Sequence, residues 1–139
     1  MPFVLDASIA LAWYLPGQGN AYATAVYEHL NSGADQASAP LLWRVELASV
    51  LLRSHRRGDI SETHALQALA DAEHLPIALF DIHLTSTEIF RLGKRYRLSG
   101  YDAVYLELAR RLDLPIASAD RGIRSAAAHH GISVFQRAP

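Results

Sequence analysis

The sequence lacks cysteine altogether, and its 139 residues include a single lysine and a single methionine. Without cysteine the protein can form neither a disulfide nor a thiolate metal site, which suits a reducing cytoplasm. An excess of charge of either sign is also missing, because the formal net charge is −1 at pH 7. The protein as a whole therefore does not attract polyanions. Any nucleic acid must be held by local basic patches, by metal ions or by a partner.

Long apolar runs are absent as well, and no stretch reaches the roughly 18 uncharged apolar residues of a membrane-spanning helix. The apolar beginning, Met1 to Leu15, has no basic start and contains Asp6, so it does not have the pattern of a secretory signal. Half of the residues are apolar and 19% are charged, which is typical of a globular protein. We expect one cytoplasmic domain, residues 1–139, that buries its own core and has no membrane segment.

Short apolar runs alternate with longer stretches of helical periodicity along the whole chain. We expect strands at residues 3–5, 36–39, 77–80, 116–118 and 132–135. We expect helices at about residues 9–15, 21–30, 42–57, 61–74, 82–96, 99–112 and 121–129. This order predicts an α/β fold, with about five parallel strands and helices on both faces of the sheet.

Asp6 stands at the end of the first expected strand. The apolar run Phe3-Val4-Leu5 ends on it, and Ala7-Ser8 leads into the first helix. In open α/β sheets the ligand crevice lies at the carboxyl ends of the strands, so this acid is a candidate catalytic group. The structural alternative is that Asp6 only caps the helix, since aspartate is a favoured N-cap residue.

Three further acids occupy comparable places. Asp102 opens an expected helix, Asp120 follows a short apolar run, and Glu46 lies beside the apolar face of a helix. Because the carboxyl ends of parallel strands share one edge of a sheet, these acids are expected to meet Asp6 there. Unit charges a few ångströms apart repel by about 1 kcal/mol in water and by several times more inside a protein, so the cluster requires a cation. All-oxygen ligands select Mg²⁺ or Mn²⁺.

Each acid also has a structural explanation. Ser99-x-x-Asp102 has the form of a capping box, and Asp120 can cap the last expected helix. Glu46 can reach solvent from the edge of its apolar face. The joint occurrence of the acids at corresponding strand ends is what favours a functional site over these explanations.

Two other interpretations of the chain stay open. Asp6 resembles the nucleophile of aspartyl-phosphate phosphohydrolases, although position 8 is a serine where those enzymes have a second acid, and the single lysine, Lys94, lies in an expected helix. The chain can also be a non-catalytic binding module. His129 and His130 do not form a metal-binding pair, because adjacent helical side chains point apart by about 100°, and this favours a surface or packing role.

Four stretches of the sequence resemble, in order and at similar spacing, the acidic motifs of PIN-domain ribonucleases. They are Val4–Ser8, Trp43–Ala48, Ser99–Tyr105 and Ala117–Asp120. The resemblance covers essentially the whole chain and is closest to the small bacterial and archaeal VapC toxins of toxin–antitoxin modules. It implies a doubly wound parallel sheet and a metal-dependent endoribonuclease that a cognate VapB antitoxin inhibits.

The resemblance also assigns roles to residues. It implies an acidic quartet that binds Mg²⁺, or Mn²⁺ in its place: Asp6, Glu46, Asp102 and Asp120. It implies two supporting polar groups, Ser8 and Ser118. Asp6 and Asp102 are expected to be direct ligands, Glu46 a ligand or the residue that orients the attacking water, and Asp120 a ligand of a second ion or a group acting through water. Relatives often have asparagine one helical step after the glutamate, where this chain has Ser49.

Partners are less visible in the residues. Basic residues within 53–57 and 91–97 can contact RNA phosphates, but as exposed charges they can equally be solvated. Tyr101, beside Asp102, can stack on a base. Apolar helix faces around Trp13, Trp43 and Leu66–Leu69 can line a groove for an antitoxin segment. The RNA substrate, the VapB-type antitoxin and a homodimer are expected from the resemblance alone.

Overall fold

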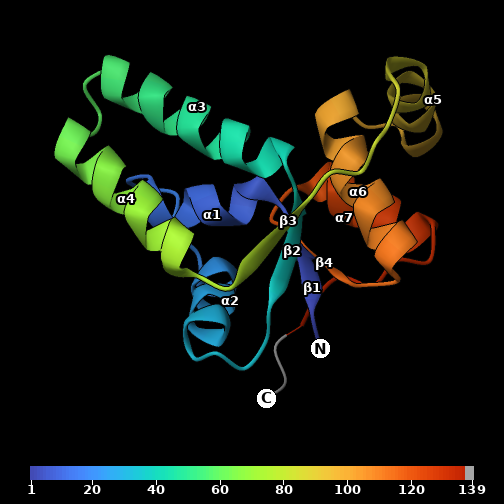
Figure 1. Cartoon of the computed structure of the whole chain (residues 1–139), viewed down its shortest axis with the longest axis horizontal. Coiled ribbons are helices and arrows are strands. Elements are labelled where there is room, and N and C mark those ends of the chain that lie inside the picture. Colours follow the sequence, from blue (N-terminus) through green and yellow to red (C-terminus); the bar gives the residue numbers. More distant parts are fainter. Residues whose placement is uncertain (137–139) are drawn as a thin grey trace.

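The computed structural model describes residues 1–136, which form a parallel sheet between two layers of helices (Figure 1). Its four strands are β1 (Phe3–Leu5), β2 (Ala37–Pro40), β3 (Ile77–Phe80) and β4 (Ile116–Ala117). They pair in the order β3-β2-β1-β4, and every pairing is parallel. The predicted α/β class with a parallel sheet is confirmed.

The helices cover both faces of the sheet. Within the described residues they are α1 (Ala7–Tyr14), α2 (Ala21–Asn31), α3 (Leu42–Arg56), α4 (Glu62–His74), α5 (Ser86–Tyr96), α6 (Gly100–Leu112) and α7 (Arg121–His129). Figure 1 shows α1 to α4 on one side of the sheet and α5 to α7 on the other. Because helices lie on both faces, the central strands are buried, and Phe3, Val4 and Leu5 of β1 are each 0% exposed.

Three of the strands pass directly into helices at the same edge of the sheet. β1 leads into α1, β2 into α3 and β4 into α7. The register pairs Val4 of β1 with Ser38 of β2 and with Ile116 of β4, so the ends of these strands lie level with one another. The first residues of α1, α3 and α7 therefore line one edge.

The prediction of about five strands is wrong, since residues 132–135 do not form a full strand. This segment pairs with β4 through one bridge, Ile116 to Val134. The backbone N–H of Ile116 donates to the carbonyl of Ser133 at 2.9 Å, and the N–H of Phe135 donates to the carbonyl of Ile116 at 2.8 Å. β4 is only two residues long, so it offers its outer neighbour too few backbone groups to extend the pairing.

The helix predicted over residues 82–96 begins later, at Ser86. Thr85 caps it: its hydroxyl accepts the backbone N–H of Glu88 and donates to the Glu88 carboxylate, both at 3.1 Å. A capping box fixes a helix start more strongly than an apolar pattern does, which is why residues 82–85 stay outside the helix. No helix in the described part of the chain is long and apolar enough to cross a membrane.

Candidate active site

Asp6 occupies the first position after β1 and is almost completely buried, with 4% of its surface exposed. Its backbone stands at the N-cap position of α1, but its side chain makes no capping hydrogen bond. Instead its Oδ2 accepts the hydroxyl of Ser8 at 2.5 Å and the hydroxyl of Ser118 at 2.9 Å. The capping alternative therefore does not explain this buried carboxylate.

Ser8 and Ser118 hold this carboxylate between two strand ends. The backbone N–H of Ala119 donates to Ser8 Oγ at 3.2 Å, and the N–H of Asp120 donates to Ser118 Oγ at 3.0 Å. Each hydroxyl is thereby left to use its own hydrogen toward Asp6. The two serines connect the β1–α1 junction to the β4–α7 junction, and both hydrogen bonds go to the same oxygen of Asp6.

Asp120 and Asp102 begin helices at the same edge. Asp120 caps α7, because its Oδ2 accepts the backbone N–H of Ile123 at 2.8 Å. Asp102 lies in the first turn of α6, and its own N–H is capped by Ser99 Oγ at 3.1 Å. The capping roles expected for both acids are present. They leave Asp120 Oδ1 and the half-buried carboxylate of Asp102 at the edge shared with Asp6.

Glu46 extends from α3 and is half-buried. Its Oε1 is a buried oxygen without a hydrogen-bond partner, and the same is true of Tyr105 Oη on α6. The two groups are neighbours. Burial raises the pKa of Glu46, and the Tyr105 hydroxyl is close enough to oppose part of this rise, although the two groups do not reach the geometry of a full hydrogen bond. An unsatisfied carboxylate oxygen beside other acids is a place where a cation or a proton is stabilising.

Electrostatic coupling shows that the four acids converge. Burial raises the pKa of Asp6 from 3.8 to about 6, with smaller contributions from the charges of Asp102 and Asp120. Burial also raises the pKa of Glu46, to which Asp6 and Asp102 add. The pKa of Asp102 is raised by burial and by Asp120. Acids that are far apart in the sequence therefore share one negative region at the carboxyl edge of the sheet.

Comparisons with known proteins agree with this arrangement. The family model described as PIN domain matches residues 3–129. The chain belongs to the PIN domain family. PIN domains are generally nucleases, and these nucleases usually use divalent metals. The chain is also similar to the crystal structure of PAE2754 from Pyrobaculum aerophilum, with a TM-score of 0.64, 16% identity, and coverage of 91% of this chain and 84% of that one. At this identity the similarity shows the fold alone. No curated protein matches.

The oxygen atoms of this PIN domain fit a hydrated divalent cation. Among residues 1–136, no three or more His, Asp or Glu side chains are arranged so that they could hold one ion between them. Mg²⁺ usually keeps several waters and is bound through one or two carboxylates, so a site for it does not require three protein ligands. All the donors are oxygens, and Glu46 Oε1 is a buried oxygen that still lacks a partner. These side chains suit a hard ion that ligates one or two acids and reaches the others through water.

Sequence reasoning missed two neighbours of the acids in this PIN domain. Tyr105 can by its pattern be a core residue or stack on a base; it is fully buried, and its hydroxyl faces Glu46. Arg124 was not considered; its Nε donates to the carbonyl of Ser118 at 2.6 Å. Each residue lies one helical turn after an acid, Asp102 or Asp120, so the i+3 and i+4 positions of these helices carried the signal.

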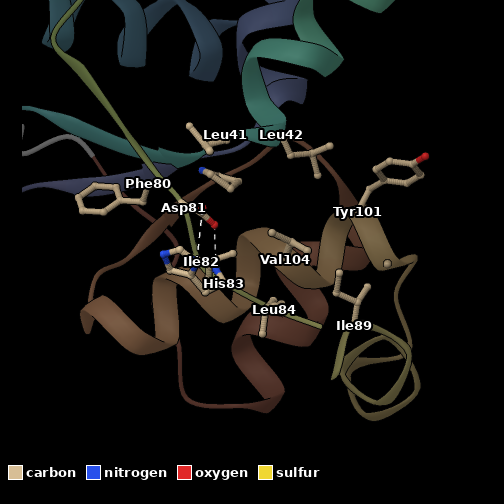
Figure 2. Close-up of a pocket in the computed structure, with 12 residues that line it drawn as sticks. Leu41, Leu42, Phe80, Asp81, Ile82, His83, Leu84, Ile89, Tyr101 and Val104 are labelled. Carbon is tan, nitrogen blue, oxygen red and sulfur yellow. Dashed lines mark hydrogen bonds and ion pairs between the residues drawn. The ribbon is translucent and has the colours of Figure 1, made fainter. Parts of the chain in front are cut away.

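An apolar pocket of about 490 Å³ is lined by residues close in the chain to two of the acids, while Asp81 is the acid that lines it (Figure 2). Tyr101 precedes Asp102 and is 63% exposed, and Leu42 lies one helical turn before Glu46. Figure 2 shows Asp81 and His83 together on the connection after β3, where Asp81 Oδ1 accepts the N–H of His83 at 3.0 Å. Asp81 is a strand-end acid outside the negative region, so it offers a control for the other four.

The basic residues at 53–57 lie apart from the negative region. They follow Glu46 along α3 by roughly 10 to 17 Å at the ordinary rise of an α-helix. Figure 1 shows this end of α3 pointing away from α5, α6 and α7. Arg57 pairs with Asp59 at 3.1 Å. These side chains act as exposed charges at the end of a helix, where the helix dipole favours them.

Proposed function

We propose that this PIN domain is a metal-dependent endoribonuclease that acts as the toxin of a type II toxin–antitoxin system. The observation that carries the proposal is Asp6: a buried carboxylate that caps no helix, is oriented by two serines and lies among three other acids. Keeping such a group buried and ionised is unfavourable unless a cation lies beside it. Family membership supports nuclease activity, while RNA as substrate and the toxin role rest on the resemblance to VapC toxins.

Phosphodiester cleavage requires a nucleophilic water, relief of charge on the phosphate and help for the leaving oxygen. A bound Mg²⁺ or Mn²⁺ ion supplies chemistry of this kind. Asp6 is the residue best prepared to hold the ion, because Ser8 and Ser118 fix its Oδ2 and leave Oδ1 to ligate. Asp102 would be the second ligand of the ion, or would bind a water molecule that the ion holds. Asp120 would have one of the same two roles.

Glu46 is assigned to the attacking water. Its pKa is raised by burial, and its Oε1 has no hydrogen-bond partner, so it is a better proton acceptor than an ordinary exposed glutamate. Tyr105 lies against it and limits its freedom to turn. Glu46 therefore orients the water and takes its proton in this proposal.

The proposal includes a cognate VapB-type antitoxin and a homodimer. Several large apolar side chains are exposed on the helices, among them Val45 at 60%, Leu66 at 59% and Phe90 at 74%. They lie on three different helices, and covering them with an antitoxin segment or a second copy would remove them from water. The antitoxin and the homodimer themselves rest on the resemblance to VapC toxins.

Cleavage by the purified protein tests the proposal. Wild type should cut a pool of cellular RNA in Mg²⁺ or Mn²⁺, EDTA should abolish the activity, and added Mn²⁺ should restore it. Asp6→Asn and Asp102→Asn should each lose about 100-fold or more in rate, because an ion held less well stabilises the transition state less. Asp81→Asn, a strand-end acid outside the negative region, should cut like wild type.

Induced expression tests the toxin role. Wild type should arrest growth, and the Asp6→Asn and Asp102→Asn variants should not. If both variants arrest cells as fully as wild type, the nuclease-toxin proposal fails. Cleavage that continues unchanged in EDTA would refute the metal requirement, and a purified protein that binds a partner but cuts no RNA in either ion would instead be a binding module.

A further inference from the structure

A second pocket, more polar than the first and of about 400 Å³, lies between the end of α5 and one side of α7. Four basic side chains line it: Arg95, Arg97, His129 and His130. All four are exposed. Basic residues favour the ends of helices because of the helix dipole. The dipole does not explain why two helices from different parts of the chain bring their basic residues to one cavity.

The positive charge in this pocket has no counterpart. Within residues 1–136, none of the six ion pairs involves any of the four basic side chains. Two permanent guanidinium charges therefore stand beside two imidazoles, and none of these four side chains is in an ion pair with a carboxylate. A group of like charges in one concave site is stabilised by an anion.

The wall of the pocket is held firmly. Tyr96 is 4% exposed and its ring meets His130 edge-on, with centroids 4.8 Å apart. The Tyr96 hydroxyl donates to Glu107 Oε1 at 2.9 Å, and Glu107 is also bonded by Arg110 at 2.7 Å. Arg97 is placed by a left-handed turn at φ 56° that ends α5. The basic side chains thus extend from an ordered surface.

The pocket adjoins the acids of the candidate active site. Gly122 lines it, and a Cβ atom at this glycine would lie 3.1 Å from Asp120 Oδ2. Arg97 stands two residues before Ser99, whose hydroxyl caps the helix turn that carries Asp102. An extended polyanion lying on the acids would therefore reach the basic side chains next.

We propose that this pocket is a phosphate subsite, which receives a backbone phosphate of the RNA strand beside the phosphate that is cut. This inference rests on the proposed function. The net charge of the protein is −1 and the acidic region without its ion repels the strand, so a positive site next to the acids would add attraction for the strand. Arginine binds phosphate through two parallel N–H groups, and the pocket offers two such side chains.

Charge removal tests the subsite. The pocket variant is Arg95→Gln with Arg97→Asn, since asparagine tolerates the left-handed backbone at position 97. The control is Arg53→Gln with Arg56→Gln, which removes the same charge from the far end of α3. For a single-stranded RNA oligonucleotide, the pocket variant should raise KM roughly tenfold with little change in kcat. Its binding, measured in EDTA by fluorescence anisotropy, should lose about 0.7 from the slope of log K against log salt concentration, because one phosphate contact is lost. The control should change neither quantity.

Neutralising one phosphate at a time locates the contact. A methylphosphonate at one position near the cut should weaken binding to wild type, and the same change should have no further effect on the pocket variant, because both remove one interaction. The subsite is overturned if the pocket variant matches the control, or if every methylphosphonate affects both proteins equally. If wild type cuts no RNA in Mg²⁺ or Mn²⁺, the proposed function fails, and the binding comparison in EDTA still decides on the pocket.

Discussion

Replacing Asp6 by asparagine should stabilise the metal-free protein, and the gain should grow with pH. Asparagine has the same shape, and its carbonyl oxygen can accept the hydroxyls of Ser8 and Ser118 that now bind Oδ2. The substitution therefore removes the charge and little else. Burial is the main cause that raises the pKa of Asp6 from 3.8 to about 6, so ionising this residue costs about 3 kcal/mol more in the folded protein than in the unfolded chain.

The sign of the pH dependence follows from proton binding. Between about pH 4 and about pH 6 the folded protein keeps a proton on Asp6 that the unfolded chain has already released. The free energy of unfolding therefore falls as the pH rises through this window, and the loss is complete above about pH 6. Near pH 4 wild type and Asp6→Asn should be equally stable. Near pH 7.5 the variant should be more stable by up to about 3 kcal/mol, an upper limit because hydrogen bonds to a neutral amide are weaker than those to a carboxylate.

Urea unfolding in EDTA, followed by far-UV circular dichroism from about pH 4 to about pH 8, measures this difference. Asp81→Asn is the matched control, because Asp81 is also a strand-end acid but its side chain is 58% exposed. Its stability should stay within about 0.5 kcal/mol of wild type at every pH. Adding excess Mg²⁺ should stabilise wild type more than Asp6→Asn, because an ion bound to the carboxylate stabilises only the folded state that holds it.

Two results would refute the reasoning. One is an Asp6→Asn protein less stable than wild type near neutral pH without metal, which would mean that the buried carboxylate is not destabilising. The other is a difference that does not vary with pH, which would mean that the charge is not its cause.

Two further predictions concern the residues around the site. Glu107→Gln should lower the free energy of unfolding by about 2 kcal/mol near neutral pH, since the carboxylate is buried against Arg110 and Arg111, whose half-exposed side chains limit the gain. The pKa of Glu107 is lowered from 4.5 to about 2, mainly by its hydrogen bonds with Arg110. Wild type should therefore lose the stability that this carboxylate contributes as the pH falls from about 4.5 toward 2, while the variant should not. Tyr105→Phe should change stability by less than about 1 kcal/mol, because the hydroxyl it removes is buried without a partner. It should also raise the pKa of Glu46 and move the acidic limb of the cleavage rate profile to higher pH.

The free energy of unfolding, measured from neutral pH down to about pH 2, checks the Glu107→Gln prediction. A wild type whose stability depends on acid in the same way as that of the variant would contradict it. The second is checked by urea unfolding together with a pH profile of cleavage. A Tyr105→Phe enzyme whose profile does not move would show that the hydroxyl has no influence on Glu46. Tyr96→Phe, which removes a hydroxyl bonded to Glu107 instead, is the control for that profile.

Local patterns in the sequence were sufficient for most of the secondary structure. The strands at residues 3–5 and 77–80 and the helix at 121–129 have the predicted bounds, because apolar runs, periodicity and capping depend on neighbours within about four residues. The late start of α5 was within reach of the same rules, since Thr85 and Glu88 form a capping box that the apolar pattern concealed. The short pairing of residues 132–135 was not, because it depends on the length of β4.

What the sequence by itself determined is the PIN fold class, the order of its elements and the identity of the acids at the ends of strands and the beginnings of helices. What only the tertiary structure decided is which of these acids act together. Ser118 reaches Asp6 across 112 residues of chain because β4 pairs with β1, and Asp81 stays apart because β3 lies at the far edge of the sheet. A carboxylate becomes a site through burial and through charges brought beside it, and both depend on strand pairing that no local pattern specifies.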